Sequence, residues 1–146
     1  MRILFVLLCA PAFAQNEASI EKAVLAANDQ ATRAAEDRDA DRLFSFMAET
    51  DKGSIVQNGT LFLTPQDAKA RIAPGFRAPV KVAYHWKQQH VTVLSATTVL
   101  LVSEGEAVIT PEGQPPTTAP LVQTTVWVQR EGAWKILHAH QSSPPR

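Results

Sequence analysis

The sequence predicts an α+β domain in which about three N-terminal helices pack on one face of a strongly bent, mixed or antiparallel sheet. Residues 18–38 contain no Gly or Pro and are rich in alanine, the strongest helix former. After Pro79, segments rich in Val, Thr, Leu and aromatic residues alternate with turn signals, which is typical of antiparallel strands. The length of 146 residues suits one domain with a single hydrophobic core.

The first two helices are predicted from residue spacing. In residues 18–38 the apolar positions recur every three or four residues and therefore share one side of a helix: Ile20, Val24, Ala27, Ala31 and Ala34. Because most of these side chains are alanine, an element that packs on this side can approach closely. A shorter helix is expected over residues 40–47, with Asp39 or Asp41 near its positive N-terminus.

The third helix has the clearest local signal in the chain. Thr64 can cap it, Pro65 fits the first turn, where no amide partner is needed, and Asp67 can reach back to the cap. The helix must end before Pro74-Gly75, because neither residue continues a helix well.

The remaining signals predict strands. Turn signals at Gly53 and Gly59 bracket a short strand over residues 54–57, and residues 61–63 follow as its partner or as a lead-in to the helix. Longer strands are predicted over residues 80–94, 98–110, 121–130 and 133–141. Residues 111–120 contain four of the ten prolines, so we predict a mobile connection there.

The two faces of the predicted sheet differ in chemistry. With a two-residue turn at Glu131-Gly132 and strict alternation, one face collects Gln123, Thr125, Trp127, Gln129, Trp134, Ile136, His138 and His140. The opposite, aliphatic face carries Val122, Thr124, Val126, Val128, Leu137 and Ala139, and we expect it beneath the alanine-rich helix. The same counting from a turn near Ala96-Thr97 groups Val91, Val93, Leu100 and Val102, opposite His90 and, without a bulge, Trp86 and Tyr84.

The face rich in indole and imidazole groups is too apolar to remain in water, and aromatic residues are enriched at protein interfaces. We therefore predict a homodimer that packs through this sheet face, with these contact residues: Trp86, His90, Trp127, Trp134, His138 and His140. Two alternatives are a face that lines a pocket and a face covered by the proline-rich connection.

The N-terminus predicts export. Met1 and Arg2 precede an uncharged apolar run over residues 3–14, which ends in Ala12-Phe13-Ala14, so we expect a signal peptide over residues 1–14 and cleavage before Gln15. The run spans about 18 Å as a helix, too short for a hydrocarbon core of about 30 Å. The alternatives are an uncleaved amphipathic N-terminus and a lipoprotein anchored at the only cysteine, Cys9.

Residues 15–146 then form one exported domain, periplasmic or secreted from a bacterium and without a membrane anchor, whose last few residues are a tail. Loss of Cys9 excludes disulfides, a cysteine nucleophile and thiolate metal ligands.

Charge and histidine content exclude several kinds of partner. The chain has 14 Lys+Arg against 14 Asp+Glu and no basic stripe, so we expect no nucleic-acid partner. His138 and His140 lie roughly 6.5–7 Å apart along a strand, a spacing that two metal ligands can use. No carboxylate is evident beside them, so we expect no metal site, and nothing in the sequence indicates a cofactor.

A few polar groups are expected to reach a mostly apolar cavity between helices and sheet. The candidates are Gln57, His85, Gln89, Thr124, Gln141, Arg33 and Arg71. Together they predict a site for a small, apolar organic ligand. The catalytic residues are unknown: a ketosteroid type of isomerase needs a carboxylate base facing a Tyr or a protonated Asp, and strict alternation places Tyr84 on the wrong face.

Two segments resemble a known superfamily. Asp37-Arg38-Asp39-Ala40, which opens the second helix, and residues 132–142 (Gly-Ala-Trp-Lys-Ile-Leu-His-Ala-His-Gln-Ser) are similar to the nuclear transport factor 2-like fold. Within it, the SnoaL-like domains and the association domain of calcium/calmodulin-dependent kinase II are nearest. Their last strand reads Gly-x-Trp-x-Ile-Val-His-x-His-x-Ser-x-x-Pro, matched here through Ser142 and Pro145 or Pro144.

The resemblance implies a cone-shaped fold, a cavity between helices and sheet, and frequent dimerisation or higher assembly. It implies no reaction, because this fold hosts isomerases, dehydratases, hydrolases and pure binders. In the kinase association domains the residue after the second His is often Arg. Here it is Gln141, which weakens the inference of an anionic ligand bound in that manner.

Three classes of function stay open. The first is an exported binding or assembly domain without chemistry of its own. The second is a small enzyme of isomerase, dehydratase or hydrolase type that acts on an apolar organic substrate. The third is a module that binds or neutralises another protein. An ionisable residue deep in the cavity would favour the enzyme, whereas Gln, Thr and Trp suffice for a binder.

Overall fold

The computed structural model describes residues 11–143. Its elements are, in order: α1 (Pro11–Glu36), α2 (Ala40–Ser45), β1 (Ile55–Gln57), β2 (Thr60–Phe62), α3 (Pro65–Ile72), a 3-10 turn η1 (Ala73–Arg77), β3 (Val80–Ser95), β4 (Thr98–Pro111), β5 (Thr117–Arg130) and β6 (Ala133–Ser142). Most of the predicted signal peptide lies outside the described residues, and its predicted cleavage point after Ala14 falls within α1. Among the described helices, none combines the length and apolar character needed to cross a bilayer.

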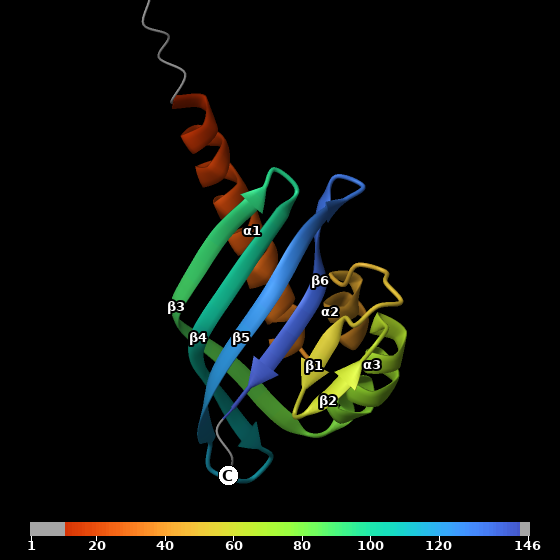
Figure 1. Cartoon of the computed structure of the whole chain (residues 1–146). Helices are drawn as coiled ribbons and strands as arrows, with labels where there is room; N and C mark the ends of the chain where they lie inside the picture. Colours follow the sequence, from red (N-terminus) through yellow and green to blue (C-terminus); the bar gives the residue numbers. More distant parts are fainter. Residues whose placement is uncertain (1–10, 144–146) are drawn as a thin grey trace, which may run out of the picture.

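One six-stranded sheet forms the body of the molecule. The strand order is β2-β1-β6-β5-β4-β3, and β1 runs parallel to β6 while the other neighbours are antiparallel. Figure 1 shows α1 crossing behind the long, bent strands, while α2, α3 and the β1–β2 hairpin close one end. The predicted α+β architecture, with helices on one face of a bent mixed sheet, is confirmed.

Local capping signals give the short helices their starting points. The Thr64 hydroxyl accepts the Asp67 amide at 3.1 Å, as its sequence signature predicts. The Asp39 carboxylate accepts the Arg42 amide at 2.9 Å at the start of α2. At the end of α1, Arg38 takes the left-handed position (φ 60°) that glycine usually occupies, and the amides of Arg38 and Asp39 bond back into the helix.

The predicted assignment of the sheet faces is wrong for two reasons. The face of β5 that carries Trp127 packs against α1 instead of pointing away from it, and three single-residue bulges in β3 and β6 interrupt the alternation. Lys87 and Leu94 have no partner in the β3–β4 register, and Leu137 has none between β5 and β6. Each extra residue moves every following side chain of that strand to the other face. Thr125 therefore pairs with Ala139 rather than with His138.

The helix-facing side of the sheet consequently carries aromatic and aliphatic residues together. Trp127 is fully buried in the core cluster, which consists of Ile20, Val24 and Ala31 of α1 with Val99, Leu101, Trp127 and Ile136 of the sheet. The Trp127 indole N–H donates to the Thr125 hydroxyl at 2.9 Å, so the ring is buried without an unpaired donor. Trp134 packs against the same cluster.

The outer face carries Leu100, Val102, Val126 and the histidines, rather than the indole groups. Leu100 and Val102 pair with Val126 and Thr124 on one side and with Thr92 and His90 on the other. They are therefore separated from Val91 and Val93, with which alternation had grouped them.

The proline-rich segment is only partly a connection. Residues 112–116 turn, but β5 already begins at Thr117, and Pro120 pairs with Glu106 of β4. The prediction of a mobile connection over residues 111–120 is therefore wrong for its second half. Among the described residues, the register of β6 reaches only Val122, so Pro120 lies on a strand with one neighbour, where a missing N–H is tolerated.

Candidate functional site

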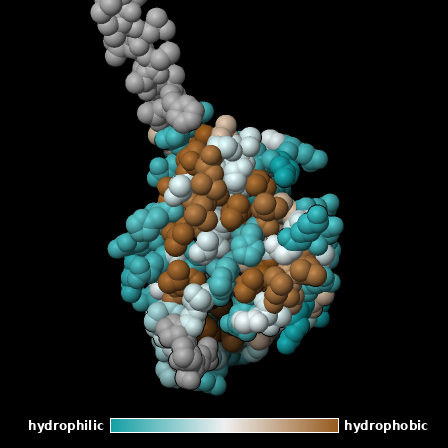
Figure 2. Space-filling model, viewed as in Figure 1, coloured by the Kyte–Doolittle hydropathy of each residue, from teal (hydrophilic) through white to brown (hydrophobic). Residues whose placement is uncertain are grey.

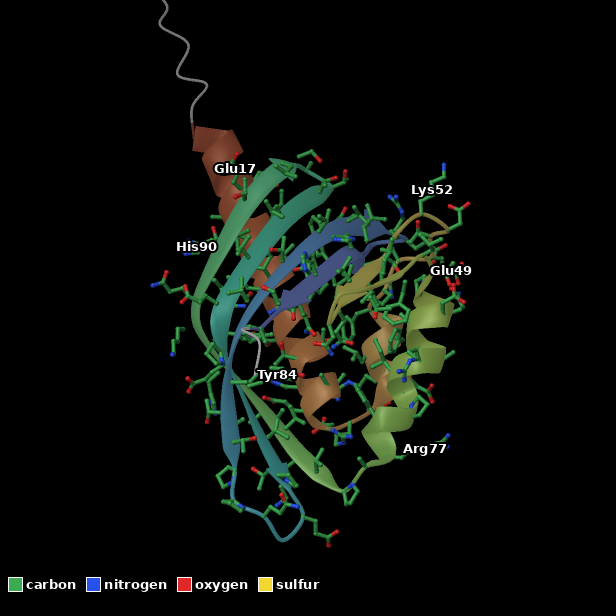
Figure 3. The ribbon with its side chains drawn as sticks, turned by 60° about the horizontal axis from the view of Figure 1, so that its bottom comes forward. Glu17, Glu49, Lys52, Arg77, Tyr84 and His90 are labelled. Atoms are coloured by element: carbon green, nitrogen blue, oxygen red, sulfur yellow. The ribbon has the colours of Figure 1, made fainter. Side chains whose placement is uncertain are left out.

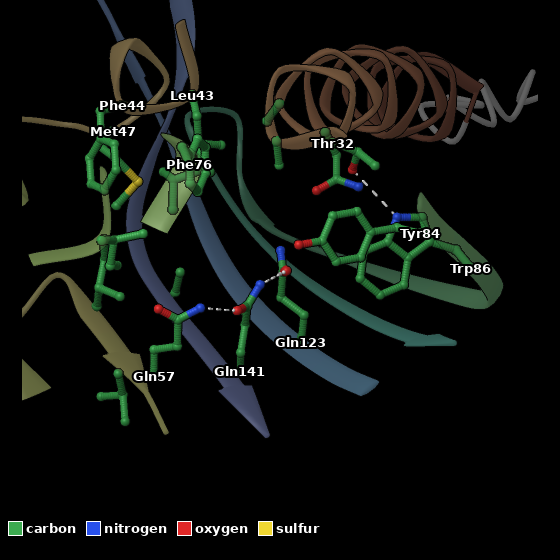
Figure 4. Close-up of a pocket in the computed structure, with 18 residues that line it drawn as sticks. Thr32, Leu43, Phe44, Met47, Gln57, Phe76, Tyr84, Trp86, Gln123 and Gln141 are labelled. Atoms are coloured by element: carbon green, nitrogen blue, oxygen red, sulfur yellow. Dashed lines mark hydrogen bonds between the residues drawn. The ribbon is translucent and has the colours of Figure 1, made fainter. Parts of the chain in front are cut away.

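A cavity of about 130 Å³ lies between α1, α2, the 3-10 turn and the helix-facing side of the sheet. Figure 4 shows its labelled side chains converging from these elements. Its walls are Asn28, Ala31, Thr32, Ala35, Leu43, Phe44, Met47, Ile55, Val56, Gln57, Ile72, Phe76, Tyr84, Trp86, Gln123, Ile136, Ala139 and Gln141. None of these lining residues is Asp, Glu, His, Lys or Arg.

Three glutamines from neighbouring strands form a hydrogen-bonded chain along the floor of the cavity. Gln57 Nε2 donates to Gln141 Oε1 at 2.9 Å, and Gln141 Nε2 donates to Gln123 Oε1 at 2.8 Å. The chain follows from the register, which pairs Gln57 with Gln141 and Gln141 with Gln123. Each of these two hydrogen bonds joins an amide N–H donor to an amide oxygen acceptor. The glutamines at the two ends of the row therefore offer only neutral hydrogen-bonding groups.

An aromatic wall stands opposite this floor. The rings of Tyr84 and Trp86 stack with centroids 5.9 Å apart and planes 9° apart. The Trp86 indole N–H donates to the Thr32 hydroxyl of α1 at 3.4 Å. Figure 4 shows the Tyr84 hydroxyl pointing toward Gln123. The bulge at Lys87 brings these two rings to the helix-facing side, away from His90.

Among residues 11–143, Tyr84 is the only titratable side chain that lines the cavity. Burial raises its pKa above the ordinary value of 10.0; the nearby Glu36 carboxylate adds to this effect and Arg38 opposes it. Glu36 is fixed by the Tyr84 backbone amide, which donates to its Oε1 at 2.8 Å. In Figure 3, Tyr84 lies within the bend of the sheet and His90 points away from β3 on the outside. The phenol is therefore protonated at neutral pH and can donate a hydrogen bond.

Arg38 fixes the 3-10 turn beside the cavity. Its Nε donates to the Phe76 carbonyl at 3.0 Å, its Nη2 donates to the Gly75 carbonyl, and its guanidinium lies 5.3 Å from the centre of the Phe76 ring. These contacts hold the ring of Phe76 against the cavity.

Of the seven residues predicted to reach a cavity, Gln57 and Gln141 line it. The other five do not: His85, Arg33 and Arg71 are exposed, Thr124 lies on the outer face, and Gln89 donates to the Ser103 hydroxyl at 3.3 Å. The corrected register explains why His85 is exposed: its neighbours Tyr84 and Trp86 point inward, so His85 points outward.

The six predicted contact residues are divided between the two faces. Trp86, Trp127 and Trp134 lie on the helix-facing side, whereas His90, His138 and His140 lie on the outer face. His138 Nδ1 lies 3.3 Å from the Gly53 carbonyl oxygen. Within residues 11–143, no group of three or more His, Cys, Asp or Glu side chains is arranged to hold a metal ion.

Sequence reasoning missed Asn28, Thr32, Tyr84, Trp86 and Gln123 as cavity residues. Thr32 and Asn28 are four residues apart on one side of α1, a spacing that could have indicated a shared surface. Tyr84 and Trp86 depend on the bulge at Lys87, for which the sequence carries no local signal, and Gln123 depends on which face of β5 packs against α1.

Comparison with known proteins supports the same fold. A family model for the SnoaL-like domain matches residues 24–146, and no match to the sequence was found among curated proteins. A proposed scytalone dehydratase from Novosphingobium aromaticivorans has a similar structure, with 12% identity, 90% of this chain and 89% of that chain covered, and a TM-score of 0.80.

Two further solved structures are similar. A hexachlorocyclohexane dehydrochlorinase from Novosphingobium barchaimii has 13% identity, with 90% of this chain and 91% of that chain covered and a TM-score of 0.72. A hub homology domain of calcium/calmodulin-dependent kinase II from Chlamydomonas reinhardtii has 18% identity, with 86% of this chain and 99% of that chain covered and a TM-score of 0.71. At these identities the likeness concerns the fold.

The fold, with a cavity between the helices and the bent sheet, defines a nuclear transport factor 2-like cone domain. Because the family model covers most of the chain, the protein belongs to the SnoaL-like domain family. The predicted resemblance is thereby confirmed.

Proposed function

We propose that the protein binds a small, uncharged organic molecule in the cavity without transforming it. The observation that carries this proposal is the composition of the wall, in which apolar side chains surround a chain of neutral amides and a protonated phenol. A few placed polar groups in an apolar pocket are typical of small-molecule sites. A charged ligand would lose its hydration without gaining an opposite charge among the lining residues.

An enzyme is the alternative, because similar structures include a dehydrochlorinase and a proposed dehydratase. Removal of a proton from a substrate needs a base that is unprotonated near neutral pH. Tyr84 is the only titratable group among the described residues of the wall, and its raised pKa works against that role. The cavity therefore favours binding over acid–base chemistry.

The binding function is tested by recovering the ligand. Protein purified from its source is extracted with organic solvent, and small molecules in the extract are identified by mass spectrometry. Ala35→Phe places a ring in the cavity and should abolish recovery, whereas Ala23→Phe, on the exposed side of α1, should not change it. Equal recovery from both variants would place the ligand elsewhere and contradict the proposal.

We also propose that the protein forms a homodimer through the outer face of the sheet. Leu100, Val102 and Val126 share this face with His90, His138 and His140, and Val122 is 41% exposed there. Figure 2 shows several hydrophobic groups on this face, separated by hydrophilic ones. A face of mostly neutral residues can meet a copy of itself without like-charge repulsion.

Sedimentation measures this association directly. The native protein should sediment as a dimer at micromolar concentration, and Val122→Lys should shift it toward the monomer because it would place a charge in the proposed contact surface. Gln114→Lys, in the exposed turn after β4, should leave the dimer intact. A monomeric native protein would refute the dimer.

Export is proposed from the N-terminal sequence alone. The mature protein should be recovered from the periplasm or the medium with Gln15 as its first residue. N-terminal sequencing of the fractionated protein tests this, and a cytoplasmic chain beginning at Met1 would contradict it.

A further inference from the structure

A buried side chain in the wall of the cavity carries a polar atom without a partner. Asn28 is 2% exposed on α1, and its Nδ2 has no hydrogen-bond partner among the described residues. Asn28 also lines the cavity. An amide N–H that is taken out of water and left unpaired costs about as much as a lost hydrogen bond, so native proteins rarely retain one without a reason.

Nothing in the helix itself accounts for asparagine at this position. Asn is a weak helix former, and an apolar side chain of the same shape would suit this buried position on α1. One turn further along α1, Thr32 accepts the indole N–H of Trp86, whose ring stacks on Tyr84. Asn28 therefore adjoins the aromatic wall, where a bound molecule would lie against both the rings and its amide.

We infer that the ligand carries a carbonyl-class oxygen that accepts a hydrogen bond from Asn28 Nδ2. This inference rests on the proposed binding function and specifies its ligand. A neutral acceptor fits because the lining residues supply amide and phenol donors but no cation that would hold a carboxylate. An apolar cavity of about 150 Å³ accommodates benzene, so the 130 Å³ available here limits the buried part of the ligand to a group of about the size of one ring.

A matched pair of probes tests the inference. Acetophenone and α-methylstyrene are both flat, single-ring molecules of nearly the same shape, but only acetophenone has a carbonyl oxygen in place of the methylene group. Each probe is titrated into the ¹⁵N-labelled native protein and followed by NMR, which reports the side-chain amide signals of Asn28 directly. The same titrations are made with Asn28→Leu, which keeps the side-chain shape and removes the donor. Gln30→Leu, on the exposed side of α1, is the matched control.

The native protein and Gln30→Leu should bind acetophenone about tenfold more tightly than α-methylstyrene, the gain expected for one hydrogen bond. In Asn28→Leu this preference should disappear, mainly because acetophenone binds more weakly. In the native protein the Asn28 side-chain amide signals should shift with acetophenone and not with α-methylstyrene, a result that does not depend on the folding of any variant.

Each contrary outcome has a distinct meaning. If both probes shift the cavity signals with equal affinity, or if Asn28→Leu keeps the preference, the carbonyl inference is overturned and the binding function stands. If neither probe perturbs the signals of the cavity residues, the proposed binding function fails, and the inference fails with it.

Discussion

Replacement of Gly105 by alanine should show whether the bulge in β3 builds the aromatic wall. Gly105 pairs with Trp86 directly beside the bulge at Lys87. A Cβ atom at Gly105 would lie 2.2 Å from the His85 carbonyl oxygen and 2.9 Å from both the His85 carbonyl carbon and the Trp86 Cα. All three are backbone atoms, so β3 itself would have to move away by about 1 Å to restore ordinary contact distances.

This displacement has a cost that can be estimated. Forcing an extra methyl group into a packed site typically costs about 1–3 kcal/mol. Weakening one or two strand hydrogen bonds adds about 0.5–1.5 kcal/mol each. We therefore expect Gly105→Ala to lower the free energy of unfolding by about 1.5–6 kcal/mol, the sum of these two effects.

Urea denaturation followed by tryptophan fluorescence measures the loss of stability. Near-ultraviolet circular dichroism should also change in the native state, because Tyr84 and Trp86 move with the backbone and lose their stacked geometry. Gly75→Ala is the matched control, since a Cβ there meets no heavy atom within 4 Å and the backbone is not left-handed. If the two variants differ by less than about 0.5 kcal/mol, close packing against the bulge is not what holds the wall in place.

Three further predictions concern the core, the phenol and the amide chain. Trp127→Ala should cost about 3–5 kcal/mol of unfolding free energy in chemical denaturation, because the ring is fully buried. Trp134→Ala, at a half-buried position, should cost less. The reverse order would contradict the placement of the core. The chain has one tyrosine, so the absorbance of the phenolate reports Tyr84 alone. The pKa of Tyr84 is raised in the folded protein, so the phenolate should appear at higher pH in the folded protein than in urea. The contribution of Tyr84 to stability is complete below pH 10 and should fall as the pH rises through the folded pKa. Identical titration curves would exclude burial of the phenol. Gln141→Ala leaves two glutamines without their partner and should lower the unfolding free energy by about 1–3 kcal/mol. The control Gln129→Ala, at an exposed position, should change it by less than about 0.5 kcal/mol. Equal effects would mean that the hydrogen bonds between the three glutamines do not stabilise the fold.

The sequence alone determined the fold class and most element positions, because these depend on interactions between residues close in the chain. The cap at Thr64 acts within one helical turn, and the turn at Glu131-Gly132 joins adjacent strands. The last strand also carried enough of a family pattern for the cone fold to be predicted. Two cavity residues, Gln57 and Gln141, were found by the same reasoning.

The tertiary structure decided which face each side chain of the long strands occupies. A bulge is one extra residue whose position depends on how a strand bends against its neighbours, so counting from a turn fails beyond Leu94 and Leu137. The bulge at Lys87 puts Tyr84 on the helix-facing side, and the face of β5 that carries Trp127 and Gln123, a strand without a bulge, packs against α1 instead of forming the expected contact surface. These residues, predicted for the outside or for no site, therefore form the core and the walls of the cavity. For Tyr84 the reason is that a shift of one residue exchanges the two faces of a strand, and for Trp127 and Gln123 it is that only packing against α1 decides which face of the sheet is buried.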